Sequence, residues 1–174
     1  MEEREFSLGK YAFYYGVTTG FILALISLLA YVPVLAPVVW LVRIIVLVWL
    51  VLYFVRRYRD QYNQGELTFG QGFFLTLLLF VYVGVIAAIY TGFQAGIMSA
   101  KESSQMFELL RDAYDQAGID LPDNVIYRII NVIPYISSFC CFLGHLILGV
   151  LVGLIFSASL KRDDSMRPDA GNDN

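Results

Sequence analysis

Four long apolar runs make up most of the chain, and short polar or proline-containing breaks separate them. The runs cover residues 11–32, 36–55, 69–97 and 131–160. About 20 apolar residues in a helix cross the ~30 Å hydrocarbon core of a bilayer, so each run is long enough to span a membrane. Pro33 and Pro37 disfavour helix and predict a tight hairpin between the first two runs. We therefore predict an all-α fold in which residues 1–162 form a four-transmembrane-helix bundle.

The polar break before the third run sets the predicted orientation. It contains Arg56, Arg57 and Arg59, and Lys and Arg in short loops are retained on the cytoplasmic side of a membrane. Eight Lys and Arg residues fall in this break and the two terminal segments, against three in segment 99–128. Both termini are therefore predicted to be cytoplasmic. Thr68 and Gln71 have the spacing of a capping box, which predicts that a new helix begins there.

Segment 99–128 is hydrophilic and acidic, and its apolar residues repeat at the spacing of one helix face. These residues are Met106, Leu109, Leu110, Ala113, Tyr114 and Ala117. We predict an amphipathic extracytoplasmic helix that packs over the ends of the spans, with Gly118 as its C-terminal cap.

Pro134 is expected in the opening turn of the fourth span, where proline is tolerated. The polar tail 163–174 is expected to be disordered.

Composition and charge agree with a membrane protein. Of all residues, 58% are apolar, whereas soluble domains have about 45–50%. Eight aromatic residues fall near predicted helix ends, as an interfacial belt would: Tyr11, Tyr14, Tyr15, Tyr31, Trp40, Tyr53, Tyr58 and Tyr135. The net charge of −3 provides no basic surface, which argues against nucleic-acid binding. The acidic N-terminus does not fit a signal peptide, so the first run is expected to remain as a membrane helix.

The central break also carries a family resemblance. Tyr58, Arg59, Asp60 and the stretch 65–73, with four spans and an acidic helical insert before the last, resemble the DUF4199 family of bacterial four-helix membrane proteins of unknown function. The resemblance covers roughly residues 11–160. It implies an integral protein of the bacterial cytoplasmic (inner) membrane, and it implies no catalytic residue.

Small residues at four-residue spacing form the first candidate feature. The longest such stripe is Gly84, Ala88, Gly92 and Gly96, and shorter ones occur at Gly16 and Gly20 and at Gly149 and Gly153. In lipid, small residues let helix backbones approach closely. Packing within one chain is the favoured interpretation, and a homodimer or another membrane protein as partner is the alternative.

Three further residues are candidates because they are polar within apolar runs. Arg43 is the only charged side chain in the four runs, and it either marks a functional site or extends to the nearby headgroups. Cys141 and His145 are spaced i, i+4 and offer a soft sulfur and nitrogen pair to a metal. Two ligands make a weak metal motif, so helix packing is favoured and no metal, cofactor or catalytic residue is predicted.

These patterns favour a non-enzymatic structural, scaffold or accessory membrane protein. The first alternative is a small oligomeric transporter or channel, although no carboxylate lies within the apolar runs to couple ions. That alternative would gain support from a cavity near Thr18, Thr19 and His145. The second alternative is an intramembrane thiol or metal site at Cys141 and His145. The lipid bilayer is the one partner that the sequence itself implies.

Overall fold

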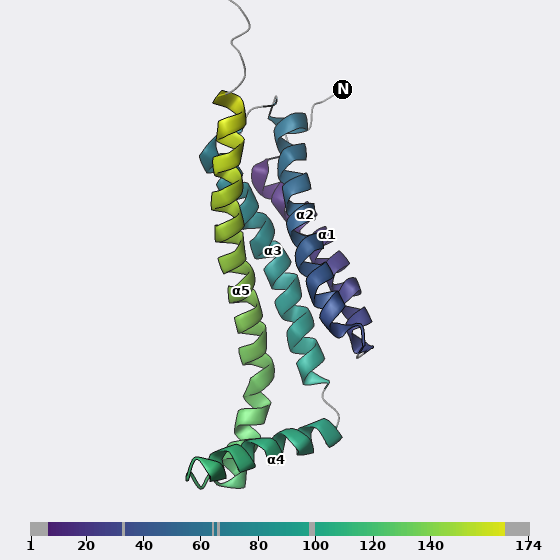
Figure 1. Ribbon diagram of the computed structural model, residues 1–174, viewed down its shortest axis with the longest axis vertical. Helices are drawn as coiled ribbons and strands as arrows, with labels where there is room; N and C mark the ends of the chain where they lie inside the picture. Colours follow the sequence, from purple (N-terminus) through teal and green to yellow (C-terminus); the bar gives the residue numbers. More distant parts are fainter. Residues whose placement is uncertain (1–6, 33, 64, 66, 98–99, 166–174) are drawn as a thin grey trace, which may run out of the picture. The chain divides into compact units, whose positions relative to one another are not determined.

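The computed structural model describes residues 7–32, 34–63, 65, 67–97 and 100–165, and within them it contains helices and no strand. The helices are α1 (Leu8–Leu28), η1 (Leu29–Tyr31), α2 (Ala36–Tyr62), α3 (Phe69–Gly96), α4 (Ala100–Gln116) and α5 (Asp123–Ser165), as Figure 1 shows. Four segments are long and apolar enough to cross a membrane: Leu8–Tyr31, Ala36–Tyr62, Phe69–Gly96 and Asp123–Ala158. The predicted all-α class with four apolar spans is therefore confirmed.

Two helices are longer than the apolar runs that predict them. α2 continues to Tyr62, so Arg56, Arg57 and Arg59 lie on its last turns and not in a loop. α5 begins at Asp123, which places Pro134 inside the helix and corrects the expectation that it lies in an opening turn. Residues 163–165 of the expected disordered tail belong to α5. The remainder of that tail and Pro33 lie outside the described residues.

The chain forms two compact units, which are described separately. The first unit comprises Met1–Ile86 and Leu143–Asn174, and the second comprises Ala87–Phe142. Both α3 and α5 therefore contribute one segment to each unit.

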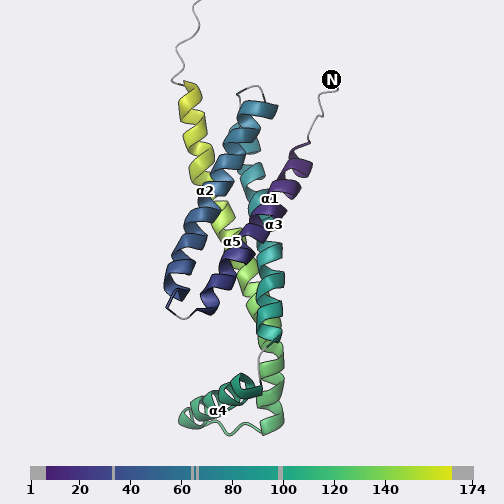
Figure 2. The same cartoon turned by 90° about the vertical axis from the view of Figure 1, so that its right-hand side faces the viewer.

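In the first unit, α1 and α2 form an antiparallel helical hairpin (Figure 2), and a buried core joins them to the neighbouring parts of α3 and α5. Glycines allow the close approach of these helices. A Cβ atom at Gly16 would lie 2.7 Å from the Cβ of Tyr82, and one at Gly149 would lie 2.6 Å from the Cβ of Phe80. Both distances are shorter than a carbon–carbon contact of about 3.5–4.0 Å. α3 therefore meets α1 through Gly16 and α5 through Gly149.

An aromatic cluster lies where α1 meets the end of α2. Tyr11 is completely buried, and its hydroxyl donates a 2.9 Å hydrogen bond to the backbone carbonyl of Phe54. Its ring packs on Tyr15 at 4.4 Å and on Tyr58 at 4.9 Å between ring centroids. Tyr58 is only 8% exposed. The prediction of an interfacial belt is therefore wrong for Tyr11 and Tyr58, because both rings face other helices.

The turn from α2 to α3 contains the predicted capping box. The amide of Gln71 donates to Thr68 Oγ1 at 3.3 Å, and the amide of Thr68 donates to Gln71 Oε1 at 3.2 Å. The side chain of Asn63 donates to the same Gln71 oxygen at 3.3 Å. Gly65 has a φ of 84°, which suits glycine because it has no Cβ. The capping box at the start of α3 is thus confirmed.

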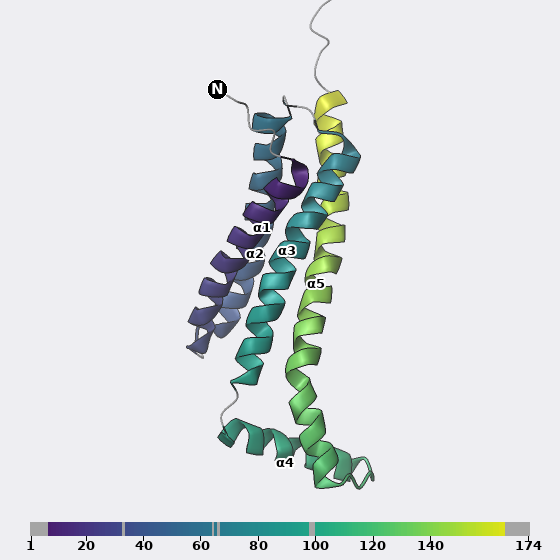
Figure 3. The same cartoon turned by 180° about the vertical axis from the view of Figure 1, so that it is seen from behind.

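In the second unit, α4 crosses the first turns of α5 (Figure 3). Gly118, with a φ of 72°, ends α4 as predicted. Ile126 of α5 is 1% exposed, and the rings of Phe107 and Tyr127 stack at 4.8 Å between centroids. An exposed ion pair joins Arg111 and Asp123 at 3.8 Å, and such pairs add little to stability.

The covered face of α4 differs in part from the predicted one. Met106, Leu110 and Tyr114 are half-buried as expected, whereas Leu109 is 66% exposed and Ala113 and Ala117 are also exposed. Phe107, which was absent from the predicted stripe, is half-buried in its stack with Tyr127. The covered face is therefore turned toward Phe107, because the aromatic contact with α5 decides which side of the helix packs.

Candidate cleft in the second unit

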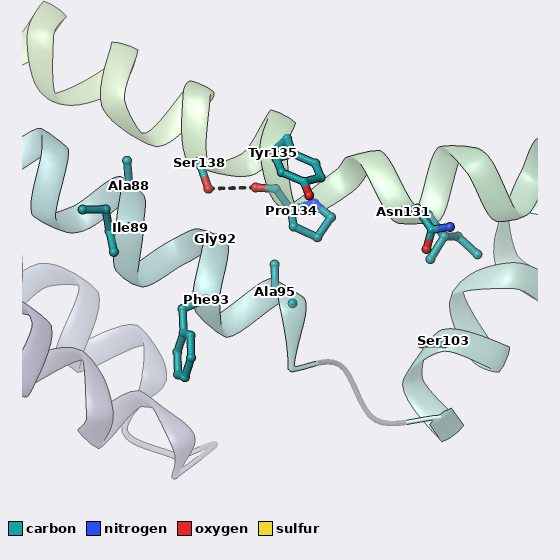
Figure 4. A pocket seen from close by; sticks show the side chains of 12 residues that line it. Ala88, Ile89, Gly92, Phe93, Ala95, Ser103, Asn131, Pro134, Tyr135 and Ser138 are labelled. Atoms are coloured by element: carbon teal, nitrogen blue, oxygen red, sulfur yellow. Dashed lines mark hydrogen bonds between the residues drawn. The ribbon is translucent and has the colours of Figure 1, made fainter.

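A half-open cleft in the second unit is the principal candidate site (Figure 4), with a volume of about 610 Å³. α3 contributes Ala88, Ile89, Gly92, Phe93, Ala95 and Gly96, α4 contributes Ser103, and α5 contributes Ile130, Asn131, Pro134, Tyr135 and Ser138. Ligand pockets in proteins typically measure about 300–1,000 Å³. The volume of the cleft lies in this range, and the cleft is open to its surroundings.

Close contacts at one place bring α3 and α5 together beside the cleft. A Cβ atom at Gly92 would clash with the hydroxyl of Ser138. One residue earlier, the Thr91 hydroxyl donates to the sulfur of Cys141 at 3.5 Å. Gly92 is thus needed for this close contact between α3 and α5 beside the cleft.

Pro134 shapes the wall that α5 contributes. A proline has no N–H, so Pro134 cannot donate to the carbonyl of Ile130, and its ring crowds that carbonyl. The Ser138 hydroxyl donates a 2.8 Å hydrogen bond to the Pro134 carbonyl. Ile130, Pro134 and Ser138 are four residues apart and all line the cleft, so the irregular face of α5 is the one that borders it.

The polar groups of the lining are distributed unevenly. Figure 4 shows Asn131 on the side where α4 carries Ser103, whereas Ala88 and Ile89 lie toward the other end, beyond Gly92. Asn131 offers both amide donors and a carbonyl acceptor, and Ser103 offers a hydroxyl. The Ser138 hydroxyl is already engaged by Pro134. The cleft therefore has a polar end next to α4 and an apolar end along α3.

The predicted stripe of small residues on α3 is divided between different surroundings. Gly84 is buried, Ala88 and Gly92 are half-buried, and Gly96 is exposed. A Cβ atom at Gly96 would meet nothing within 4 Å. The last member of the stripe therefore borders open space in the cleft.

Arg43 lies within α2, in the first unit, and is half-buried. Its Nε atom is buried and has no hydrogen-bond partner among the described residues. This arrangement is unusual because a buried guanidinium nitrogen normally donates a hydrogen bond. The two interpretations of Arg43 from the sequence, a functional site or a side chain extended to the headgroups, both stay predictions.

The proposed thiol and imidazole pair lies on α5. Cys140 is exposed, Cys141 is half-buried and accepts the Thr91 hydrogen bond, and His145 is half-buried. Within the part of the chain that the structure describes, no group of three His, Cys, Asp or Glu side chains has the arrangement of a metal site. The Thr91 hydrogen bond makes Cys141 part of the contact between α3 and α5, and a thiol or metal site at Cys141 and His145 stays a prediction.

The transport alternative depended on polar side chains near the middle of α1. The hydroxyls of Thr18 and Thr19 each donate to a carbonyl four residues earlier in the same helix, at 2.8 Å. Neither threonine lines the cleft, and neither does His145.

Sequence reasoning missed the cleft itself, although one signal was present. Pro134 and Ser138 are four residues apart, and so are Ala88 and Gly92 on the other apolar run. A proline and small residues at helical spacing indicate a place where two helices pack irregularly. The Tyr11 bond to Phe54 had no comparable signal, because its acceptor is a backbone carbonyl.

Comparison with known proteins gives a family and no activity. No curated protein and no solved structure matches the chain significantly. The family model described as "Protein of unknown function (DUF4199)" matches residues 10–162, which cover the four apolar spans except Leu8 and Gly9 at the start of the first. The chain therefore belongs to the DUF4199 family.

Proposed function

We propose that the chain is a non-enzymatic accessory protein of the bacterial cytoplasmic membrane, which holds an apolar group in the cleft of its second unit. The first unit acts as a rigid helical scaffold. The observation that carries the proposal is the lining of the cleft, which combines small, aliphatic and aromatic side chains with a few hydroxyl and amide groups. Such a lining supplies shape and hydrogen bonds, which are what binding needs.

The scaffold role rests on the packing of the first unit. Its core includes Tyr11, Val51, Leu79 and Phe80, all of them completely buried. Glycine contacts fix α3 against α1 and α5 with little free space. A region packed in this way supports a fixed geometry and leaves little room for a ligand.

A photo-crosslinking amino acid in place of Phe93 tests the binding role in living cells. Phe93 is a lining residue of the cleft and is 69% exposed, and Phe21 on α1 is a matched control at 58% exposure. We expect an adduct at position 93 that is stronger, and more enriched in one molecular species, than the adduct at position 21. Adducts of equal yield and composition at both positions would contradict a binding role for the cleft.

The proposed orientation has both termini and the α2–α3 turn in the cytoplasm and α4 outside it. It rests on the excess of Lys and Arg in the terminal and central segments. A reporter that is active only outside the cytoplasm should be active when fused after Glu108. Activity after Asn63 would reverse the orientation.

A further inference from the structure

We infer that the occupant of the cleft is one acyl chain of a zwitterionic phospholipid from the leaflet on the α4 side. This inference rests on the proposed binding function and specifies its ligand. The polar end of the cleft, with Ser103 and Asn131, accepts the ester region of the lipid. The apolar end along Ala88 and Ile89 accepts the hydrocarbon chain.

The polarity of the lining matches a phospholipid that keeps its normal orientation in the bilayer leaflet. α3 and α5 are two of the four apolar spans, whereas α4 is hydrophilic. A phospholipid likewise has its ester groups at the interface and its chains in the hydrocarbon core. Asn131 and Ser103 can donate hydrogen bonds to an ester carbonyl, while the remaining lining is mostly carbon.

Charge favours an occupant without net negative charge. Among the side chains that the structure describes, no Asp, Glu, Lys or Arg lines the cleft, so none of them would neutralise an anionic headgroup there. The adjacent helix α4 exposes Glu102, Glu108, Asp112 and Asp115 against the single exposed cation Arg111 among its described side chains. An anionic headgroup would be repelled by these carboxylates, whereas the ammonium group of a zwitterionic lipid would be attracted.

The dimensions favour a hydrocarbon chain over a helix from a second copy. The lining of α3 extends from Ala88 to Gly96, which corresponds to about 12 Å at ~1.5 Å per residue. A helix with its side chains is itself about 10–12 Å wide, so it could enter this slot only crosswise. Gly92, which a docking helix would use for close approach, already meets Ser138 of the same chain.

The test measures adducts between the full-length chain and a phosphatidylcholine that carries a diazirine on its acyl chain. The purified protein is reconstituted in phosphatidylcholine vesicles, irradiated, and mapped by peptide mass spectrometry. We expect adducts concentrated in peptides that contain residues 88–96 and 131–138. Vesicles of phosphatidylglycerol with the same diazirine acyl chain should give at least threefold less adduct there.

Gly96→Leu fills the open space of the cleft and should lower this adduct yield at least fivefold. Gly70→Leu is its matched control, because Gly70 is on the same helix, is exposed, and likewise has nothing within 4 Å of a Cβ atom. Equal yields in the native chain and both variants would mean ordinary surface lipid and would overturn the inference.

A second pair keeps the test decisive if Gly96→Leu does not fold. Asn131→Leu removes the polar end and should lower the yield at least twofold, whereas Asn124→Leu, outside the cleft, should not change it. Equal yields in this pair would overturn the assigned role of Asn131.

A crosslink between two copies at position 93 would overturn the lipid inference and leave the binding function standing. Equal or higher yield with phosphatidylglycerol would overturn the choice of headgroup.

Discussion

Both units bring helices into close contact through a glycine, but they differ in how completely side chains fill the space around that contact. In both, a glycine on one helix faces a side chain of another: Gly16 faces Tyr82 in the first unit, and Gly92 faces Ser138 in the second. The first unit surrounds these contacts with a continuous buried core. Among the described residues of the second, the buried apolar side chains are Ala87, Ile126 and Ile130, and a cleft of about 610 Å³ lies beside the contact.

The difference shows that close helix contact does not by itself produce a filled interior. The large side chains of Phe80 and Tyr82 occupy the space at the glycine contacts of the first unit. In the second unit α3 contributes the small residues Ala88, Ala95 and Gly96, and its larger lining residues Ile89 and Phe93 are 65% and 69% exposed. The volume of the residues around a contact therefore decides between core and binding cleft.

The largest expected effect is on the first unit, from Gly16→Leu. A Cβ atom there would lie 2.7 Å from the Tyr82 Cβ and 3.2 Å from the carbonyl oxygen of Leu79, so backbone must move. Overpacking of this kind costs about 3 kcal/mol. We expect the melting temperature in detergent to fall by roughly 6–12 °C. Gly9→Leu, on the same helix with nothing within 4 Å, is the control and should leave it unchanged.

The matching change in the second unit, Gly92→Leu, should lower the free energy of unfolding by less than Gly16→Leu does. Its first clash is with the Ser138 hydroxyl, a side-chain group that can rotate away into the adjoining cleft. We expect the free energy of unfolding to fall by about 1–2 kcal/mol, which is toward the low end for overpacking. Gly144→Leu, where a Cβ has nothing within 4 Å, serves as control in the same melting experiment. A loss as large as that of Gly16→Leu would remove the distinction between the units.

The sequence predicts the elements of both units better than it predicts their packing. Thr68, Gln71 and Gly118 act locally, through caps that depend on a few neighbouring residues, and all three have their predicted roles. Burial of Tyr11 could not be predicted, because α1 is apolar on all sides and its pattern does not show which side meets another helix. In a soluble helix, polar residues would have marked the outer face.

The same limit applies to the candidate site. The stripe from Gly84 to Gly96 correctly marks a region of close approach, since Gly92 meets Ser138. Its regular spacing cannot show that the contact ends before Gly96, because that depends on the partner residues of α5. The apolar run begins only at residue 131 and so predicts Pro134 in an opening turn, whereas α5 already begins at Asp123.

A smaller effect is expected from Tyr11→Phe, which removes one hydrogen bond and keeps the ring. The bond from Tyr11 to the Phe54 carbonyl is buried, and interhelical hydrogen bonds in membrane proteins are worth about 0.6 kcal/mol on average and 1.7 at most. We expect a loss near 1 kcal/mol, seen as a decrease of about 2–4 °C in melting temperature. Tyr14→Phe, at an exposed ring, should have no effect. Equal melting temperatures for both variants would show that the hydroxyl adds nothing to the first unit.

The last prediction concerns the cover that α4 gives the second unit, and it requires no change in stability. Leu110 is half-buried and Asp112 is exposed, two positions apart on one helix. In a background with Cys140 and Cys141 replaced by Ala, a single cysteine at position 112 should react with a membrane-impermeant thiol reagent at least fivefold faster than one at position 110. The reason is that position 110 lies on the covered face with Met106 and Tyr114. Equal rates would mean that α4 is free of α5 in solution, and the polar end of the cleft would then lose Ser103.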